Sequence, residues 1–234
     1  MEYLPNEVLT ELKEYIIFKP KNKEELQNAV DIWCIDKDKA LKKYCHISLW
    51  DTSLITIMPF LFFEKEFFND DISNWDVSKV EDMDHMFYKC TNFNQPLDKW
   101  DVGNVEDMCG MFNKAIKFNQ PLNNWNVSKV ETMTHMFYEC ENFNQPLNNW
   151  NVSKVKNISS MFQKCIIFNQ PLNSWDVSNV KNMYGLFKEA SSFNQPLNSW
   201  DVSLVTNMCY MFCEALFFNQ PLNSWDVSSV INME

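Results

Sequence analysis

An Asp or Asn follows each of seven regularly spaced tryptophans, and this column holds the first side chains that could do chemistry. Its members are Asp76, Asp101, Asn126, Asn151, Asp176, Asp201 and Asp226. Stacked carboxylates can bind calcium, which takes oxygen ligands. The two Asn residues, however, keep the shape and lose the charge, and both residue types make turns through a side-chain hydrogen bond to the backbone. We therefore expect a structural turn here, with calcium binding as the alternative.

Other groups that could do chemistry do not form a recognisable set. His85 and His135 share a register position but are separated by two repeats, and Cys209 and Cys213 have no His or Cys partner to complete a zinc site. No acid–base pair, Gly-rich phosphate loop or nucleophile–base set recurs in the chain. We expect a protein that is not an enzyme and that has no catalytic residues, no metal and no cofactor.

A repeat of 25 residues must position these side chains. The block Phe-Asn-Gln-Pro-Leu recurs and leads each time into a tryptophan three residues later. A fixed period in this range predicts a solenoid, in which each repeat is stable only when stacked on its neighbours. The tryptophans of this period are Trp50, Trp75, Trp100, Trp125, Trp150, Trp175, Trp200 and Trp225.

The pattern inside each repeat predicts a short helix followed by a short strand. Val80, Met83, Phe87 and Cys90 recur as one stripe of a helix whose start Asp82 could cap. The next segment, 93–97, is typical of a short extended strand. We therefore predict an α/β repeat solenoid for residues 50–234. It would be a leucine-rich-repeat-like stack of about seven 25-residue coils, each with one short strand and one short helix.

Residues 1–49 lie outside the repeat and are predicted to form a helical N-terminal cap. A first amphipathic helix would run from Pro5 to about Ile16. A second would begin at Asn22 as N-cap, with Glu25 completing a capping box, and a third would span about 39–44. Such a cap would cover the open end of the stack.

Composition restricts the partners and the compartment. The net charge is -11 and the chain contains no Arg, which argues against nucleic-acid binding. No apolar run is long enough to span a membrane and no secretion signal precedes the first segment, so we expect no membrane partner and a cytoplasmic protein. Cys90, Cys140 and Cys165 share a position with alanines in other repeats, which indicates free, buried thiols.

The recurring order Trp-Asp-Val-Ser, Val-x-x-Met, Met-Phe, Cys or Ala, and Phe-Asn-Gln-Pro-Leu covers residues 45–234. In this order the chain resembles the BspA-like leucine-rich-repeat surface proteins, whose 25-residue repeats are known from mycoplasma lipoproteins. The resemblance implies a leucine-rich-repeat-like fold and, in secreted bacterial members, adhesion. Without a visible signal, the chain looks more like the copies that large DNA viruses and some protists encode. A viral copy would be host-cytoplasmic or virion-associated.

Variation between repeats indicates where a partner could bind. A column of charges changes sign along the chain, and a pair with one or two apolar residues replaces a polar pair in every second repeat. A solvated face is the alternative for the first set, and extra core is the alternative for the second. The candidate partner-binding residues are Glu81, Glu106, Glu131, Lys156 and Lys181 in the first set, and Ile116, Ile166, Ile167, Leu216 and Phe217 in the second.

These observations predict a non-catalytic protein–protein interaction scaffold with a protein partner of unknown identity. One alternative is an F-box-like substrate receptor of a ubiquitin ligase, because residues 4–9, Tyr15, Ile16 and Trp33 are similar to the opening of an F-box. Others are a structural virion component or an adhesin. The apolar C-terminal coil, with Phe218 and Leu222, further predicts a possible homodimer; fraying or a truncated chain is the alternative.

Overall fold

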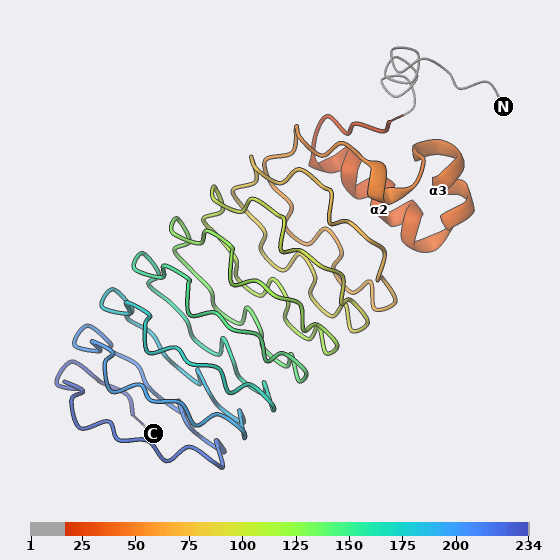
Figure 1. The fold of residues 1–234 in the computed structure, drawn as a ribbon. Coiled ribbons are helices and arrows are strands. Elements are labelled where there is room, and N and C mark those ends of the chain that lie inside the picture. Colours follow the sequence, from red (N-terminus) through yellow and green to blue (C-terminus); the bar gives the residue numbers. More distant parts are fainter. Residues whose placement is uncertain (1–16, 234) are drawn as a thin grey trace.

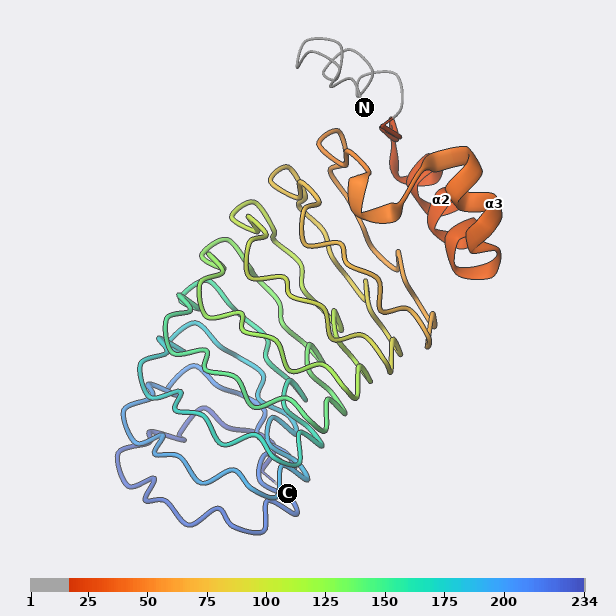
Figure 2. The same cartoon turned by 45° about the vertical axis from the view of Figure 1, so that its right-hand side comes forward.

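The computed structural model describes residues 17–233, and these residues form one long stack of coils with helices at one end (Figure 1). Each coil occupies 25 residues, so that residues 25 apart lie above one another. Figure 2 shows the coils as flattened loops that follow one another along the stack, with the C-terminus at the end far from the helices.

Within the described residues, two α-helices and a short 3-10 helix precede the coils: α2 (Lys23–Ile35), α3 (Lys37–Tyr44) and η1 (Ile47–Leu49). The predicted start at Asn22 is confirmed, since its side-chain oxygen accepts a hydrogen bond from the backbone N–H of Glu25 at 3.0 Å. The predicted helix over residues 5–16 lies outside the described residues. Among the helices of the described part, none is long and apolar enough to cross a membrane.

The helices pack against the first coil through Trp33 of α2. Its ring lies edge-on to Trp50, with 5.9 Å between the centroids, and its indole N–H donates to Asp70 at 2.8 Å. Gln27 donates from the same helix to the carbonyl oxygen of Leu61 at 2.9 Å. Side chains of α2 therefore contact the coil that contains the first repeat tryptophan.

The predicted α/β solenoid of leucine-rich-repeat type, with a strand and a helix in each coil, is wrong. Across residues 50–233 the structure contains no helix, and its β-structure is limited to isolated parallel bridges of one residue per coil. The chain between these bridges is mostly turns. The bridged residues are Ile57, Asp82, Asp107, Thr132, Asn157, Asn182, Asn207 and Asn232, each paired with the next.

The segment for which the apolar stripe predicted a helix forms a series of turns instead. Its backbone N–H groups alternate between two kinds of acceptor. The N–H groups of His85, Phe87 and Lys89 donate to carbonyl oxygens of the next coil at 2.7–2.8 Å. The intervening N–H groups, as in Tyr88, donate to the residue three before them in the same coil. An α-helix would direct all of them along its own axis, so the bonds between coils replace it.

The core consists of aromatic columns that run the length of the stack. Rings of one phenylalanine column lie almost parallel to their neighbours, as in Phe137 and Phe162, with centroids 5.8 Å apart. Each ring also contacts a ring of the second column, as Phe137 contacts Phe143 at 4.1 Å. The tryptophans complete this core from one corner, and those from Trp50 to Trp200 are buried.

The Phe-Asn-Gln-Pro-Leu segments are joined by side chains. The side-chain oxygen of Asn119 accepts the backbone N–H of Asn144 at 3.0 Å and the side-chain amide of Gln145 at 3.1 Å. The same arrangement recurs in the following coils. This ladder allows Pro to stand in the segment, since no backbone N–H is needed from that residue.

Candidate functional site

The column of Asp and Asn residues after the tryptophans forms turns, as the sequence predicts. The carboxylate of Asp76 accepts the backbone N–H of Ser78 at 3.0 Å and its hydroxyl at 2.6 Å. Asn126 accepts the N–H of Ser128 at 3.2 Å in the same way. These hydrogen bonds, led by the one from the Ser78 hydroxyl, lower the pKa of Asp76. The side-chain oxygens are used within their own turns, which favours a structural role over calcium.

The charge column lies on the surface of the stack. Glu81, Glu106, Glu131, Lys156 and Lys181 are all exposed. Where the sign changes, Lys156 donates to Glu131 at 2.6 Å, and this bond lowers the pKa of the Glu131 carboxyl. Both side chains of this pair are more than half exposed, so solvent screens the attraction. The column is therefore exposed and carries a charge gradient along the stack, and its part in binding a partner stays a prediction.

The apolar residues of alternate coils point outward. Ile166 and Ile167 are 42% and 43% exposed in an interior coil, and Leu216 and Phe217 are 76% and 68% exposed in the last. Ile116 is half-buried. The alternative in which this set adds to the core is therefore wrong for four of its five members.

Sequence reasoning missed Phe67, which occupies the same register position in the first coil and is 88% exposed. The available signal was its shared register position with Ile167 and Phe217, which follow it by four and six repeats. We call Phe67, Ile116, Ile166, Ile167, Leu216 and Phe217 the apolar row. The backbone beneath it is held between coils, since Ser192 donates its N–H to Ile166 and Phe217 donates its N–H to Ser191.

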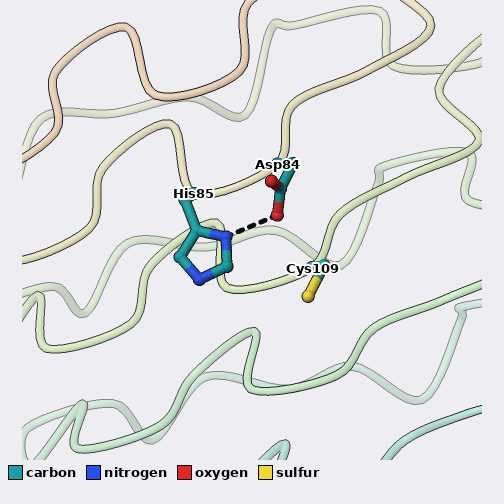
Figure 3. Close-up of side chains that lie close together, drawn as sticks. All are labelled: Asp84, His85 and Cys109. Carbon is teal, nitrogen blue, oxygen red and sulfur yellow. Dashed lines mark hydrogen bonds and ion pairs between the residues drawn. The ribbon is translucent and has the colours of Figure 1, made fainter.

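A cluster of three potential metal ligands lies on two neighbouring coils (Figure 3). One ligand atom from each of Asp84, His85 and Cys109 lies within 4.8 Å of the others. His85 Nδ1 is 2.5 Å from a carboxylate oxygen of Asp84. All three side chains are partly exposed. We call this set the Asp-His-Cys cluster.

The charges around this cluster are negative. Burial, together with the nearby charge of Asp84, raises the pKa of the Cys109 thiol to about 12. Burial also raises the pKa of Asp107, and the neighbouring carboxylates of Asp84 and Asp82 act in the same direction. The negative charge of these carboxylates favours the approach of a cation.

Periodicity could not reveal the Asp-His-Cys cluster. Asp84 and His85 are adjacent in one coil, and Cys109 comes from the next, where the repeat places it beside Asp84. His135 and Cys209 recur at the positions of His85 and Cys109, but among the described coils only Asp84, His85 and Cys109 bring the three donor types together. A comparison of adjacent coils for Asp, His and Cys at neighbouring register positions would have found it.

The last coil leaves an apolar hollow of about 680 Å³. Met211, Phe212, Leu222 and Trp225 are among the residues that line it. Pairing of two chains through this coil stays a prediction.

Of the F-box-like residues, those at 4–9, 15 and 16 lie outside the described part, and Trp33 is buried in the packing of α2.

Comparison with known proteins identifies one family. Its profile, described as "Mycoplasma protein of unknown function, DUF285", matches residues 35–150 and residues 132–234. No curated protein and no solved structure matches the chain.

Proposed function

We propose that this chain, which belongs to the DUF285 family of mycoplasma proteins of unknown function, is a non-catalytic scaffold. It would bind a partner protein along the apolar row. One observation carries this proposal. Ile166 and Ile167 lie in the middle of the stack, with neighbouring coils on both sides, and yet both side chains are exposed by more than two fifths. Apolar side chains that repeat along one edge are typical of a protein-binding surface.

The spacing of the row suits an extended partner. Members of the row occur in every second coil, and the adjacent rings of Phe143 and Phe168 are 6.0 Å apart, which gives about 12 Å between members. Because the backbone under the row is hydrogen-bonded between coils, these side chains are held in place before a partner arrives. Such preorganisation reduces the entropy lost on binding.

Charge indicates the chemistry of the partner. The chain has a net charge of -11, with Glu66 and Glu141 among the residues of the row's register positions. A partner with apolar side chains at this spacing and basic residues around them would complement this edge. The net negative charge of the chain would then steer such a basic partner toward it.

A charge-matched pair of variants tests the proposal. Ile166→Lys with Ile167→Lys places two charges in the row, whereas Ser191→Lys with Ser192→Lys places them at the same register position of the next coil. Ile166 and Ile167 are exposed and Ser191 and Ser192 are partly exposed, so both variants should melt near the parent temperature. We expect the first variant to lose its partner by at least tenfold in quantitative affinity capture, a loss of about 1.4 kcal/mol, and the second to retain it.

Two outcomes would contradict the proposal. Equal recovery of every captured protein by both variants would mean that the row does not bind. Equal loss by both would assign the effect to added charge instead of the apolar side chains.

The resemblance to copies encoded by large DNA viruses belongs to the same proposal. A structural virion component would be found in purified particles in amounts comparable with known structural proteins. Quantitative mass spectrometry of such particles distinguishes that role from a scaffold in the infected cell. The F-box-like alternative predicts capture of a Skp1-like protein instead.

A further inference from the structure

We infer that the Asp-His-Cys cluster is a binding site for a divalent transition-metal ion of the zinc class. Asp84 and His85 would bind from one coil and Cys109 from the next. The site is separate from the apolar row and does not depend on the proposed scaffold function.

The distances fit such an ion after small side-chain movements. Tetrahedral zinc with bonds of about 2.0–2.3 Å separates its ligand atoms by roughly 3.3–3.8 Å. The three ligand atoms now lie within 4.8 Å of one another, with Asp84 and His85 Nδ1 in direct hydrogen bond at 2.5 Å. Rotation of the carboxylate would open that pair and admit the ion, which would replace the hydrogen bond.

The backbone already holds the ligands together. The backbone N–H of His85 donates to the carbonyl oxygen of Cys109 at 2.8 Å, so the two coils cannot separate at this point without losing that bond. Asp84 and Cys109 are each fixed by a turn, in which their N–H groups donate to Asp82 at 2.8 Å and Asp107 at 2.7 Å.

The ring of His85 is oriented by its neighbours above and below. On one side it stacks on Phe60, with centroids 5.3 Å apart and 8° between the planes. On the other side its Nε2 edge fills the space over Gly110, where an added Cβ would lie 2.5 Å from Nε2. With Nε2 over Gly110, Nδ1 is the nitrogen that faces the other donors (Figure 3).

The donor set selects the class of metal. One sulfur, one imidazole nitrogen and one carboxylate oxygen suit zinc and its neighbours, whereas calcium and magnesium take oxygen ligands. Three protein ligands leave a fourth position, which water would fill. The thiol loses its proton to solvent as the ion binds, and the positive charge of the ion offsets the surrounding carboxylates.

Cobalt(II) titration of the full chain in a non-chelating reductant tests this site, because a cobalt–thiolate bond gives a charge-transfer band in the near ultraviolet. We expect one band, saturating at one equivalent. Cys109→Ser should abolish it, and His85→Gln and Asp84→Asn should weaken cobalt binding by at least tenfold. Cys209→Ser is the matched control, since Cys209 occupies the same coil position beside Tyr184 and Gly185 and should leave the band unchanged.

Zinc should also raise the melting temperature of the parent and of Cys209→Ser but not that of Cys109→Ser. Absence of the band at about 1 mM cobalt, which half-fills even a site with a millimolar Kd, would overturn the inference. So would a band that survives Cys109→Ser. Melting without metal shows whether each variant is folded before it is titrated.

Discussion

Replacing Trp150 by alanine is expected to lower the free energy of unfolding by about 3–5 kcal/mol, the usual cost of removing a buried aromatic side chain. Trp150 is only 3% exposed and stacks on Trp175 with 6.3 Å between the centroids. Its indole N–H donates to the carbonyl oxygen of Leu122 at 2.9 Å, so the variant also removes one of the two donors to that oxygen, the other being the backbone N–H of Trp125. Denaturant unfolding followed by circular dichroism measures the change.

Trp225→Ala is the matched control. Trp225 occupies the same position in the last coil and makes the same bond, to Leu197 at 2.9 Å, but it is only partly buried. The loss should be clearly smaller because water already reaches the site. If the two variants lost the same stability, burial in the stack would not be the cause.

Phe137→Ala is expected to have a similarly large effect, again about 3–5 kcal/mol. The ring is fully buried and contacts Phe112 at 5.7 Å and Phe162 at 5.8 Å along its own column. It also contacts Phe143 at 4.1 Å. A cavity here would interrupt its own column and remove a contact of the second, and well-packed coils have little freedom to close it. Thermal and denaturant melts would measure the loss.

Phe212→Ala provides the comparison for this column. Phe212 stacks on Phe187 at 5.8 Å but is only partly buried, and we expect it to lose less stability than Phe137→Ala. A Phe137→Ala variant that melts with the parent would show that the aromatic columns do not hold the coils together.

The sequence predicted those features that depend on a repeated side chain. Burial of the tryptophans from Trp50 to Trp200 and the turns at residues such as Asp76 follow from residue type and register. The helix start at Asn22, which lies outside the repeat, follows from its capping box. Within the repeat, each side chain makes its decisive bond or contact in its own coil or at a fixed register position of a neighbouring coil. Register alone was therefore sufficient.

The backbone path could not be predicted because the positions with positive φ, which determine it, carry no common residue type. Two positions in each coil have positive φ, such as His85 at 50° and Lys89 at 56°, and few of them are Gly. This conformation costs roughly 1–2 kcal/mol for residues with a Cβ. The hydrogen bonds from these N–H groups to the next coil offset that cost. The apolar spacing of Val80, Met83 and Phe87 is compatible with both a helix and these turns, and only contacts between coils decide.

The surface features were predicted unevenly. Ile166 and Ile167 were found because they interrupt a polar register position, whereas Phe67 lies in a degenerate first repeat whose segment reads Phe-Asn-Asp-Asp-Ile. The Asp-His-Cys cluster joins adjacent coils and occurs once among the described residues. A search for what repeats cannot detect a site that is unique.

Deletion of residues 126–150 tests most directly the central claim that each 25-residue coil is an interchangeable unit held by its neighbours. The deletion joins Trp125 to Asn151 and keeps every column in register. Stability of stacked repeats is approximately a sum over units and their interfaces. We therefore predict that the shortened chain unfolds cooperatively, with the circular dichroism spectrum of the parent per residue, and that it is more stable than Trp150→Ala. A shortened chain that has lost cooperative unfolding while Trp150→Ala melts like the parent would contradict the account.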